Sequence, residues 1–166
     1  MKKKIINFLI NYSQEHKYKF LICGTRISKF LSSKEEKFYK ELIDSKYWEY
    51  VPKSSFDSNY ILSDRSEITV SIESCLGYES LARGNKVAIF SCRGNYLNID
   101  KYDYIMGNSN GPFWTSSYNE VKFKNILDTL RKMKNDEWKE YVNSYRKNFF
   151  YFDPENKIAK NILAKC

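Results

Sequence analysis

The segment Ile68–Phe90, ITVSIESCLGYESLARGNKVAIF, constrains the fold of this 166-residue chain more than any other. It opens with β-branched residues at alternate positions, which predict a buried strand, and it closes with a second apolar run at Val87–Phe90. Between them, Ser74 is placed to cap a helix over Cys75–Arg83. Gly84 is placed to end that helix, because glycine adopts positive φ without a Cβ clash. Two buried strands joined by a helix form a βαβ unit with parallel pairing.

The turn that leads into this helix is a candidate anion site. A helix N-terminus beside the carboxyl end of a parallel strand presents N–H donors and a partial positive charge, which suit a phosphate. Ser74 adds a hydroxyl, Gly77 lets a ligand approach the backbone, and Glu79 could accept hydrogen bonds from paired sugar hydroxyls. A plain βαβ crossover with a capped helix and a solvated Glu79 explains the same pattern, so both interpretations stay open.

Strands and helices alternate along the rest of the chain, which predicts an α/β, Rossmann-like fold: a parallel sheet with helices on both faces. We expect further strands at Tyr18–Cys23, Tyr47–Val51 and Phe113–Thr115. Further helices are expected at the N-terminus, from Ser32 or Ser33 to about Ile43, over Asn59–Glu67, from Asn119, from Asn135 or Asp136, and after Pro154. The apolar side chains expected to face inward from these helices include Ile5, Ile6, Leu9, Phe38, Leu42, Ile43, Tyr60, Ile61, Leu62, Val121, Phe123, Ile126, Leu127, Leu130, Trp138, Tyr141, Val142, Tyr145, Ile158, Ile162 and Leu163.

Five polar residues fall at one edge of the predicted sheet. Ligands of open α/β sheets bind beyond the carboxyl ends of the strands. Arg26, Lys53 and Arg93 each follow a predicted strand, as do Ser74 and Glu79. The two arginines could each pair with a phosphate. The alternative for Arg26 is an ion pair with a nearby carboxylate.

Composition indicates one globular domain, residues 1–166. Hydrophobic residues make up 42% of the chain, which argues against disorder, and no apolar stretch approaches the ~20 residues that a membrane-spanning helix needs. The run Ile5–Ile10 is too short and too polar at Asn7 for a signal peptide. Aromatic content is high, and the rings of Phe113 and Trp114 either stack on a ligand or, as we expect, pack in the core.

The cysteines and the single histidine exclude an ordinary zinc site. Cys23, Cys75, Cys92 and Cys166 are far apart and form no C-x-x-C pair, and His16 is the one histidine. A reduced, cytoplasmic setting fits this pattern. We interpret the cysteines first as small buried apolar groups.

The net charge of +8 lies on the flanks of the chain. Residues 1–46 hold 11 basic and 5 acidic side chains, whereas residues 47–118 hold 6 and 8. Solvated lysines on the outer sides of helices explain this distribution, and an anionic membrane surface is a second explanation. No motif that reads DNA or RNA accompanies the charge, so we expect no specific nucleic-acid partner.

Residues 71–91, SIESCLGYESLARGNKVAIFS, resemble the donor-site segment of bacterial surface-polysaccharide glycosyltransferases of the GT-B type. The chain departs from that family at Cys75, which is usually Ser or Thr, and at Ser80, which is usually Ala. Cys75 therefore removes one hydroxyl from the phosphate cradle. The stretches GPFWT at 111–115, DEWKEYV at 136–142 and YFDPEN at 151–156 are also similar to the C-terminal half of that family. The positions that match the donor-site segment are Ser74, Leu76, Gly77, Tyr78, Glu79, Leu81, Ala82, Arg83, Gly84, Lys86 and Val87.

The resemblance implies a domain that binds the sugar-nucleotide donor of a glycosyltransferase and needs no further cofactor or metal. It implies a partner chain or a missing half that binds the acceptor and supplies the general base, and it allows peripheral contact with the inner face of the plasma membrane. The alternative is a non-catalytic interaction module with the same fold, and a two-domain sugar-nucleotide epimerase ranks third. The nucleotide-sugar site expected on this basis comprises Arg26, Lys53, Ser74, Cys75, Leu76, Gly77, Tyr78, Glu79 and Arg93.

Overall fold

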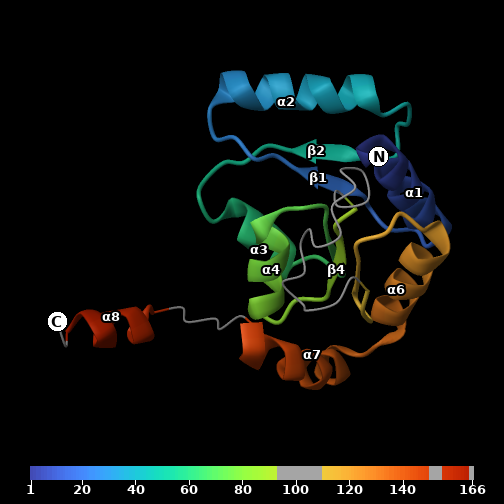
Figure 1. Ribbon diagram of the computed structural model, residues 1–166. Coiled ribbons are helices and arrows are strands. Elements are labelled where there is room, and N and C mark those ends of the chain that lie inside the picture. The colour runs from blue at the N-terminus through green and yellow to red at the C-terminus, as the bar shows by residue number, and fades with distance from the viewer. Residues whose placement is uncertain (93–109, 150–154, 165–166) are drawn as a thin grey trace.

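The computed structural model describes residues 1–92, 110–149 and 155–164 (Figure 1). Helices and strands alternate along most of the chain, as the sequence predicts. Arg93 and most of the predicted segment Phe149–Phe152 lie outside the described residues. The elements are α1 (Lys2–Glu15), β1 (Leu21–Cys23), α2 (Lys29–Leu42), β2 (Glu49–Val51), α3 (Ser58–Asp64), β3 (Thr69–Ser71), α4 (Cys75–Ala82), β4 (Val87–Phe90), β5 (Trp114–Thr115), α6 (Glu120–Lys132), α7 (Asn135–Phe149) and α8 (Lys157–Leu163).

The strands form two parallel sheets, β1-β2 and β3-β4-β5. Leu21 pairs with Glu49 in the first sheet, and Thr69 pairs with Val87 in the second. β5 joins the outer side of β4 in the same direction. The strands are short, yet β4 is buried along its whole length because helices cover both of its faces.

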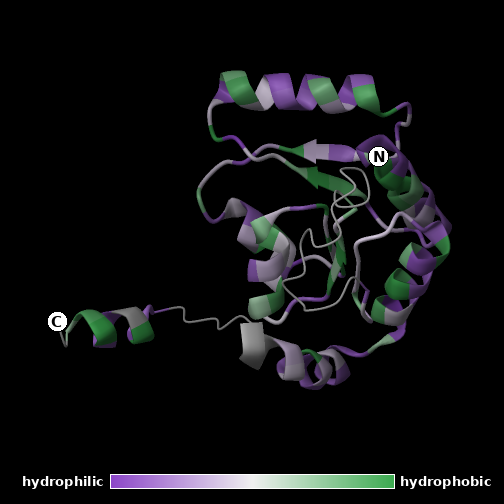
Figure 2. Ribbon diagram, viewed as in Figure 1, coloured by the Kyte–Doolittle hydropathy of each residue, from purple (hydrophilic) through white to green (hydrophobic). Residues whose placement is uncertain are grey.

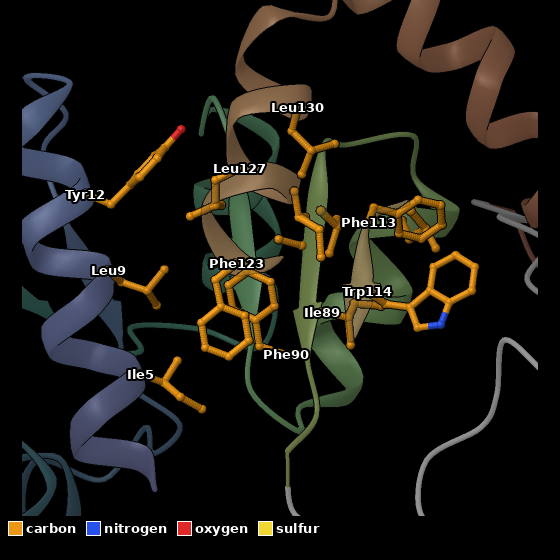
Figure 3. Close-up of a cluster of buried hydrophobic side chains, with 14 of the residues drawn as sticks. Ile5, Leu9, Tyr12, Ile89, Phe90, Phe113, Trp114, Phe123, Leu127 and Leu130 are labelled. Atoms are coloured by element: carbon orange, nitrogen blue, oxygen red, sulfur yellow. The ribbon is translucent and has the colours of Figure 1, made fainter. Parts of the chain in front are cut away.

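Figure 1 shows α3 and α4 on one side of β4 and α1 and α6 on the other, which confirms the Rossmann-like α/β fold. The main core lies between β4, α1 and α6 (Figure 3). There the Phe90 ring stacks on the Phe123 ring, with 4.1 Å between centroids. α1 also reaches the other sheet: Ile6 and Ile10 pack with Tyr39 and Ile43 in a second, smaller cluster. α1 therefore ties the two sheets together.

The predicted βαβ unit is present. Ser74 caps α4 by accepting a hydrogen bond from the Leu76 N–H, and Gly84 ends the helix with φ at 93°. The N–H of Gly84 donates to Leu81 and that of Asn85 donates to Ser80, which is the hydrogen-bond pattern of a Schellman motif. These signals are local, so the sequence was sufficient to predict them.

The prediction for α2 was wrong in its start and in its orientation. The helix begins at Lys29, with Ser28 rather than Ser32 or Ser33 at the N-cap position. Phe38 is exposed, whereas Ser32 and Tyr39 are buried. The reason is that α2 packs on its sheet through the Tyr39 ring and through hydrogen bonds that link Ser32 and Glu35 to Tyr50.

Burial was also mispredicted on four other helices, including α7, where Tyr141 is exposed. In α3 the buried residue is Ser63, which shares hydrogen bonds with Thr69 and Ser80, while Ile61 is exposed. Val121 in the first turn of α6 is exposed, although the remaining apolar residues of that helix are buried. The apolar side chains of α8 whose exposure is described, namely Ile158, Ile162 and Leu163, face solvent.

Two aromatic residues just ahead of α6 settle an alternative that the sequence left open. Phe113 and Trp114 are buried and make edge-to-face contacts with Tyr145 of α7. Their rings therefore pack in the core, as expected. Among the residues described, no helix combines the length and the apolar character that crossing a bilayer requires.

Candidate functional site

The two sheets are parted between β1 and β3. These strands share no ladder, and residues of both line one crevice of about 670 Å³. With the sheets on either side of it, the strands follow the order β2-β1-β3-β4-β5. In doubly wound folds of that order, the point between the first and third strands is where ligands bind. The Asn59 side chain donates to the Gly24 carbonyl at 2.8 Å, so α3 spans the rim of the crevice.

The turn from β3 into α4 forms one wall of this crevice. Ser71, buried at the end of β3, donates its hydroxyl to the Ser74 carbonyl at 3.0 Å and accepts from the Ser74 N–H at 3.2 Å. Between them, Glu73 adopts φ of 63°, which is rare for a residue other than glycine. Such backbone strain is concentrated at functional sites, and it persists where the surroundings fix it. Ser71 supplies that fixation.

The first-turn amides of α4 are largely engaged within the protein. The Leu76 N–H donates to the Ser74 hydroxyl at 3.3 Å, and the Gly77 N–H donates to the Ser74 carbonyl at 3.1 Å. The Cys75 N–H makes no hydrogen bond to any described residue. An anion at this turn would therefore contact the Cys75 amide and the Ser74 hydroxyl, rather than an open row of amides.

Gly77 is required for a reason other than the one expected. A Cβ built on Gly77 would lie 2.2 Å from the Cβ of Ser71. The glycine therefore allows α4 to approach β3 closely, which is how a glycine serves helix–strand packing in dinucleotide-binding folds. Gly77 is buried and still contributes to the crevice wall.

Two lysines supply positive charge to the crevice. Lys53 lies in its wall, as the sequence predicted, with its Nζ 5.9 Å from the centroid of the Phe56 ring. Lys2, which the sequence did not single out, also lines the crevice and donates to the Tyr39 hydroxyl at 2.9 Å. Arg26 is exposed and is not among the lining residues.

Glu79 lies in the crevice wall together with Cys75 and Leu76. Its carboxylate accepts a hydrogen bond from the Tyr60 hydroxyl at 2.7 Å, and this bond is the main cause that raises the pKa of Tyr60. A carboxylate has about four lone-pair sites, so Glu79 can still accept from two neighbouring hydroxyls of a ligand. Tyr78 is half-buried, packs against the main core and does not line the crevice.

The opposite wall is held by Glu35 of α2. Its carboxylate accepts from the Thr25 N–H, the Thr25 hydroxyl and the Tyr50 hydroxyl, each at 2.9 Å. These bonds fix the backbone that leaves β1. The chemistry of the site as a whole is two cations, a capped helix N-terminus and two carboxylates, those of Glu73 and Glu79. No cluster able to hold a metal ion is found among the described residues.

Among the crevice residues that the predicted site did not include are the polar residues Lys2, Thr25, Tyr60, Ser71 and Glu73. Lys2 and Tyr60 are brought in from helices by tertiary packing, so no local pattern marks them. Ser71 carried a signal, because a serine three residues before an N-cap serine is typical of a hydrogen-bonded turn.

Of the three described cysteines, Cys92 is buried as expected and Cys23 is half-buried in the crevice wall. The prediction was wrong for Cys75, which is exposed in that wall because it lies in the first turn of α4. Burial raises the pKa of the Cys23 thiol, and it raises that of the Cys92 thiol to about 11. The Glu73 carboxylate contributes to the shift at Cys92.

Residues 1–166 match the profile of a family described as "putative O-antigen biosynthesis protein". Searches of curated proteins and of solved structures give no significant match.

Proposed function

Because the chain belongs to this family of O-antigen biosynthesis proteins, we propose that residues 1–166 form the sugar-nucleotide-binding domain of a glycosyltransferase that builds surface polysaccharide. A separate acceptor-binding half, of the kind found in GT-B enzymes, would complete the active site. The domain alone is expected to bind donor without transferring the sugar.

The observation that carries the proposal is the crevice at the parted edge of β1 and β3. It combines the N-terminus of α4 with Lys53, Lys2 and Glu79 in a space of about 670 Å³, which is in the range of small-molecule sites. The lysines and the helix N-terminus suit a phosphate or diphosphate. Glu79 suits the paired hydroxyls of a ribose or a hexose.

The roles of the residues follow from this arrangement. The Cys75 amide and the Ser74 hydroxyl would contact the phosphate nearest the sugar, where Lys53 would stabilise the charge that develops on the leaving phosphate. Arg26 would add charge from the loop after β1, and Tyr60 would orient Glu79. The general base that activates the acceptor would come from the other half.

Calorimetric titration with UDP-, CMP- and GDP-sugars tests the proposal. We expect one nucleotide class to bind, and Lys53→Met and Glu79→Gln each to weaken that binding about tenfold, because each removes a charge-assisted hydrogen bond. Lys139→Met and Glu140→Gln on α7 are matched controls that should bind as the wild type does. Absence of binding by all three nucleotide classes would refute the proposal.

Alkylation of cysteine provides an independent test of the location. Cys75 is exposed in the crevice wall, so iodoacetamide should modify it, and a bound sugar nucleotide should slow that modification in proportion to occupancy. Cys92 is buried with a raised pKa and serves as the unreactive reference. If the nucleotide binds but leaves the Cys75 rate unchanged, the donor lies elsewhere.

The second candidate is a non-catalytic interaction module with the same fold. Two observations favour it: the amides of Leu76 and Gly77 are already engaged, and Cys75 replaces the hydroxyl residue of the resembled family. Such a module would show no nucleotide binding, while Ser71→Ala would still destabilise the turn.

A further inference from the structure

α2 presents three large apolar side chains to solvent, while it packs on its sheet through Tyr39, Leu42 and hydrogen bonds of polar side chains. Ser32 and Tyr39 are buried, and the Ser32 hydroxyl lies 3.1 Å from the Tyr50 hydroxyl. On the other side of the helix, Phe30 is 67% exposed, Leu31 45% and Phe38 50%. A helix at the surface of a globular protein normally keeps large apolar side chains such as these on its buried face.

The exposed side chains form one continuous face. Lys34 lies four residues after Phe30, three after Leu31 and four before Phe38, so all four share one side of the helix. We call these four residues the α2 outer face. Figure 2 shows hydrophobic and hydrophilic residues interspersed along α2, and Figure 1 places this helix at the margin of the molecule. Ile27, just before the helix, is exposed as well.

Lysines lie against the aromatic rings of this face. The Lys34 Nζ is 4.2 Å from the centroid of the Phe30 ring, and the Lys2 Nζ is 5.8 Å from that of Phe38. A lysine held in this way covers apolar surface with its stem and keeps its ammonium group in a polar layer.

The carboxylates of α2 do not offset these lysines. Glu35 is turned towards Thr25 and Tyr50, and Glu36 pairs with Lys40 at 2.7 Å. Glu41 lies 3.8 Å from Lys37. The charge left beside the exposed rings is therefore the positive charge of Lys34 and Lys2.

We propose that the α2 outer face docks the protein on an anionic membrane surface, with α2 lying in the plane of the interface. Apolar and aromatic side chains with interspersed lysines are typical of helices that bind in this way. A protein partner is the weaker explanation, because the centres of protein–protein interfaces are depleted in lysine, whereas Lys34 lies between Leu31 and Phe38. Lys2 also lines the crevice, so docking would bring the crevice rim close to the lipid.

Flotation with lipid vesicles tests this inference, which stands apart from the proposed function. The full chain should bind vesicles of phosphatidylcholine with about one third phosphatidylglycerol and should not bind pure phosphatidylcholine. The double variant Phe30→Ser/Phe38→Ser should bind at least about tenfold more weakly, because two rings are no longer removed from water. Lys34→Glu should bind at least about fivefold more weakly, and more so at low salt.

Matched controls keep the test independent of folding and of nucleotide binding. Val121→Ser on α6 and Lys139→Glu on α7 remove an exposed apolar group and a lysine elsewhere and should leave vesicle binding unchanged. All variants should retain the wild-type circular dichroism and thermal midpoint. Equal vesicle binding by the double variant and the wild type would overturn the inference, as would self-association in ultracentrifugation that the double variant abolishes while vesicles are not bound.

Discussion

The two sheets of this molecule are stabilised by different means. In the half built on β3, β4 and β5, apolar side chains of α1, α6 and α7 meet in one large cluster. In the half built on β1 and β2, the apolar cluster is small, and hydrogen bonds of hydroxyl and carboxylate groups add to the contact that Tyr39 of α2 makes with it. The difference shows that a helix in the expected place in a Rossmann-like fold can be held on its sheet by few apolar contacts and several hydrogen bonds. Phe30, Leu31 and Phe38 then stay exposed and can contact a partner surface.

Phe123→Ala and Phe38→Ala provide the sharpest test of that contrast. Phe123 is fully buried and stacked on Phe90, so its truncation should lower the free energy of unfolding by about 3–5 kcal/mol. Phe38 is half exposed, and its truncation should change stability by no more than about 0.5 kcal/mol. Urea denaturation measures both. Comparable losses would mean that α2 is buried by apolar contact after all.

Glu35→Ala tests the polar attachment of α2. The variant removes three hydrogen bonds to Thr25 and Tyr50, so we expect a loss of about 2 kcal/mol. Glu36→Ala, which breaks the pair with Lys40, should cost less than about 0.5 kcal/mol. In Glu35→Ala, hydrogen exchange should become faster at the backbone amides of β1 while it changes little at those of β4. A uniform effect on both sheets would contradict separate stabilisation.

Acid should act on the half that contains α3 and α4 through Asp64. The Arg83 guanidinium and the Asn85 amide hold the pKa of Asp64 below its ordinary value of 3.8, against a smaller opposing effect of burial. Since the pKa is lower in the folded state, the contribution of Asp64 is present above the ordinary value and is lost as pH falls through the folded value. Carboxylates titrate below about pH 5. As pH falls from there, the free energy of unfolding should decrease less steeply for Asp64→Asn than for the wild type. Identical pH profiles would exclude this origin.

Glu73→Asn should change the free energy of unfolding least among these variants, and it should raise it rather than lower it. Asparagine tolerates positive φ better than glutamate, so the variant should gain about 0.5–1 kcal/mol. Glu73→Ala retains the strained backbone and controls for loss of the carboxylate. If both variants shift the thermal midpoint equally, backbone strain at this turn is not what the substitution relieves.

The parts of the fold that could be predicted are those specified locally. Ser74, Gly84 and the two strands around them are determined by caps and β-branched alternation within one segment, and the structure has them where expected. The same holds for Asn119, which caps α6 by accepting from the Lys122 N–H at 3.0 Å.

The parts that could not be predicted depend on contacts between distant segments. The orientation of α2 is determined by Glu35 reaching Thr25 and Tyr50, and the apolar spacing of the helix gives no sign of it. The presence of Lys2 in the crevice depends on how α1 crosses the sheets. Of the predicted site residues, Lys53, Ser74, Cys75, Leu76, Gly77 and Glu79 are brought together in the crevice wall, and their binding of a nucleotide sugar stays a prediction.

The parting of β1 from β3 has a consequence for how such a domain can diversify. Where strands share a ladder, widening the space between them breaks backbone hydrogen bonds, which is costly. Here the opposing walls belong to separate ladders, and side chains such as Leu21 and Val70 line the space between them. Single substitutions at those positions can therefore change the volume of the crevice while every strand keeps its pairing. A domain of this kind can thus change which small molecule it binds without a change of fold.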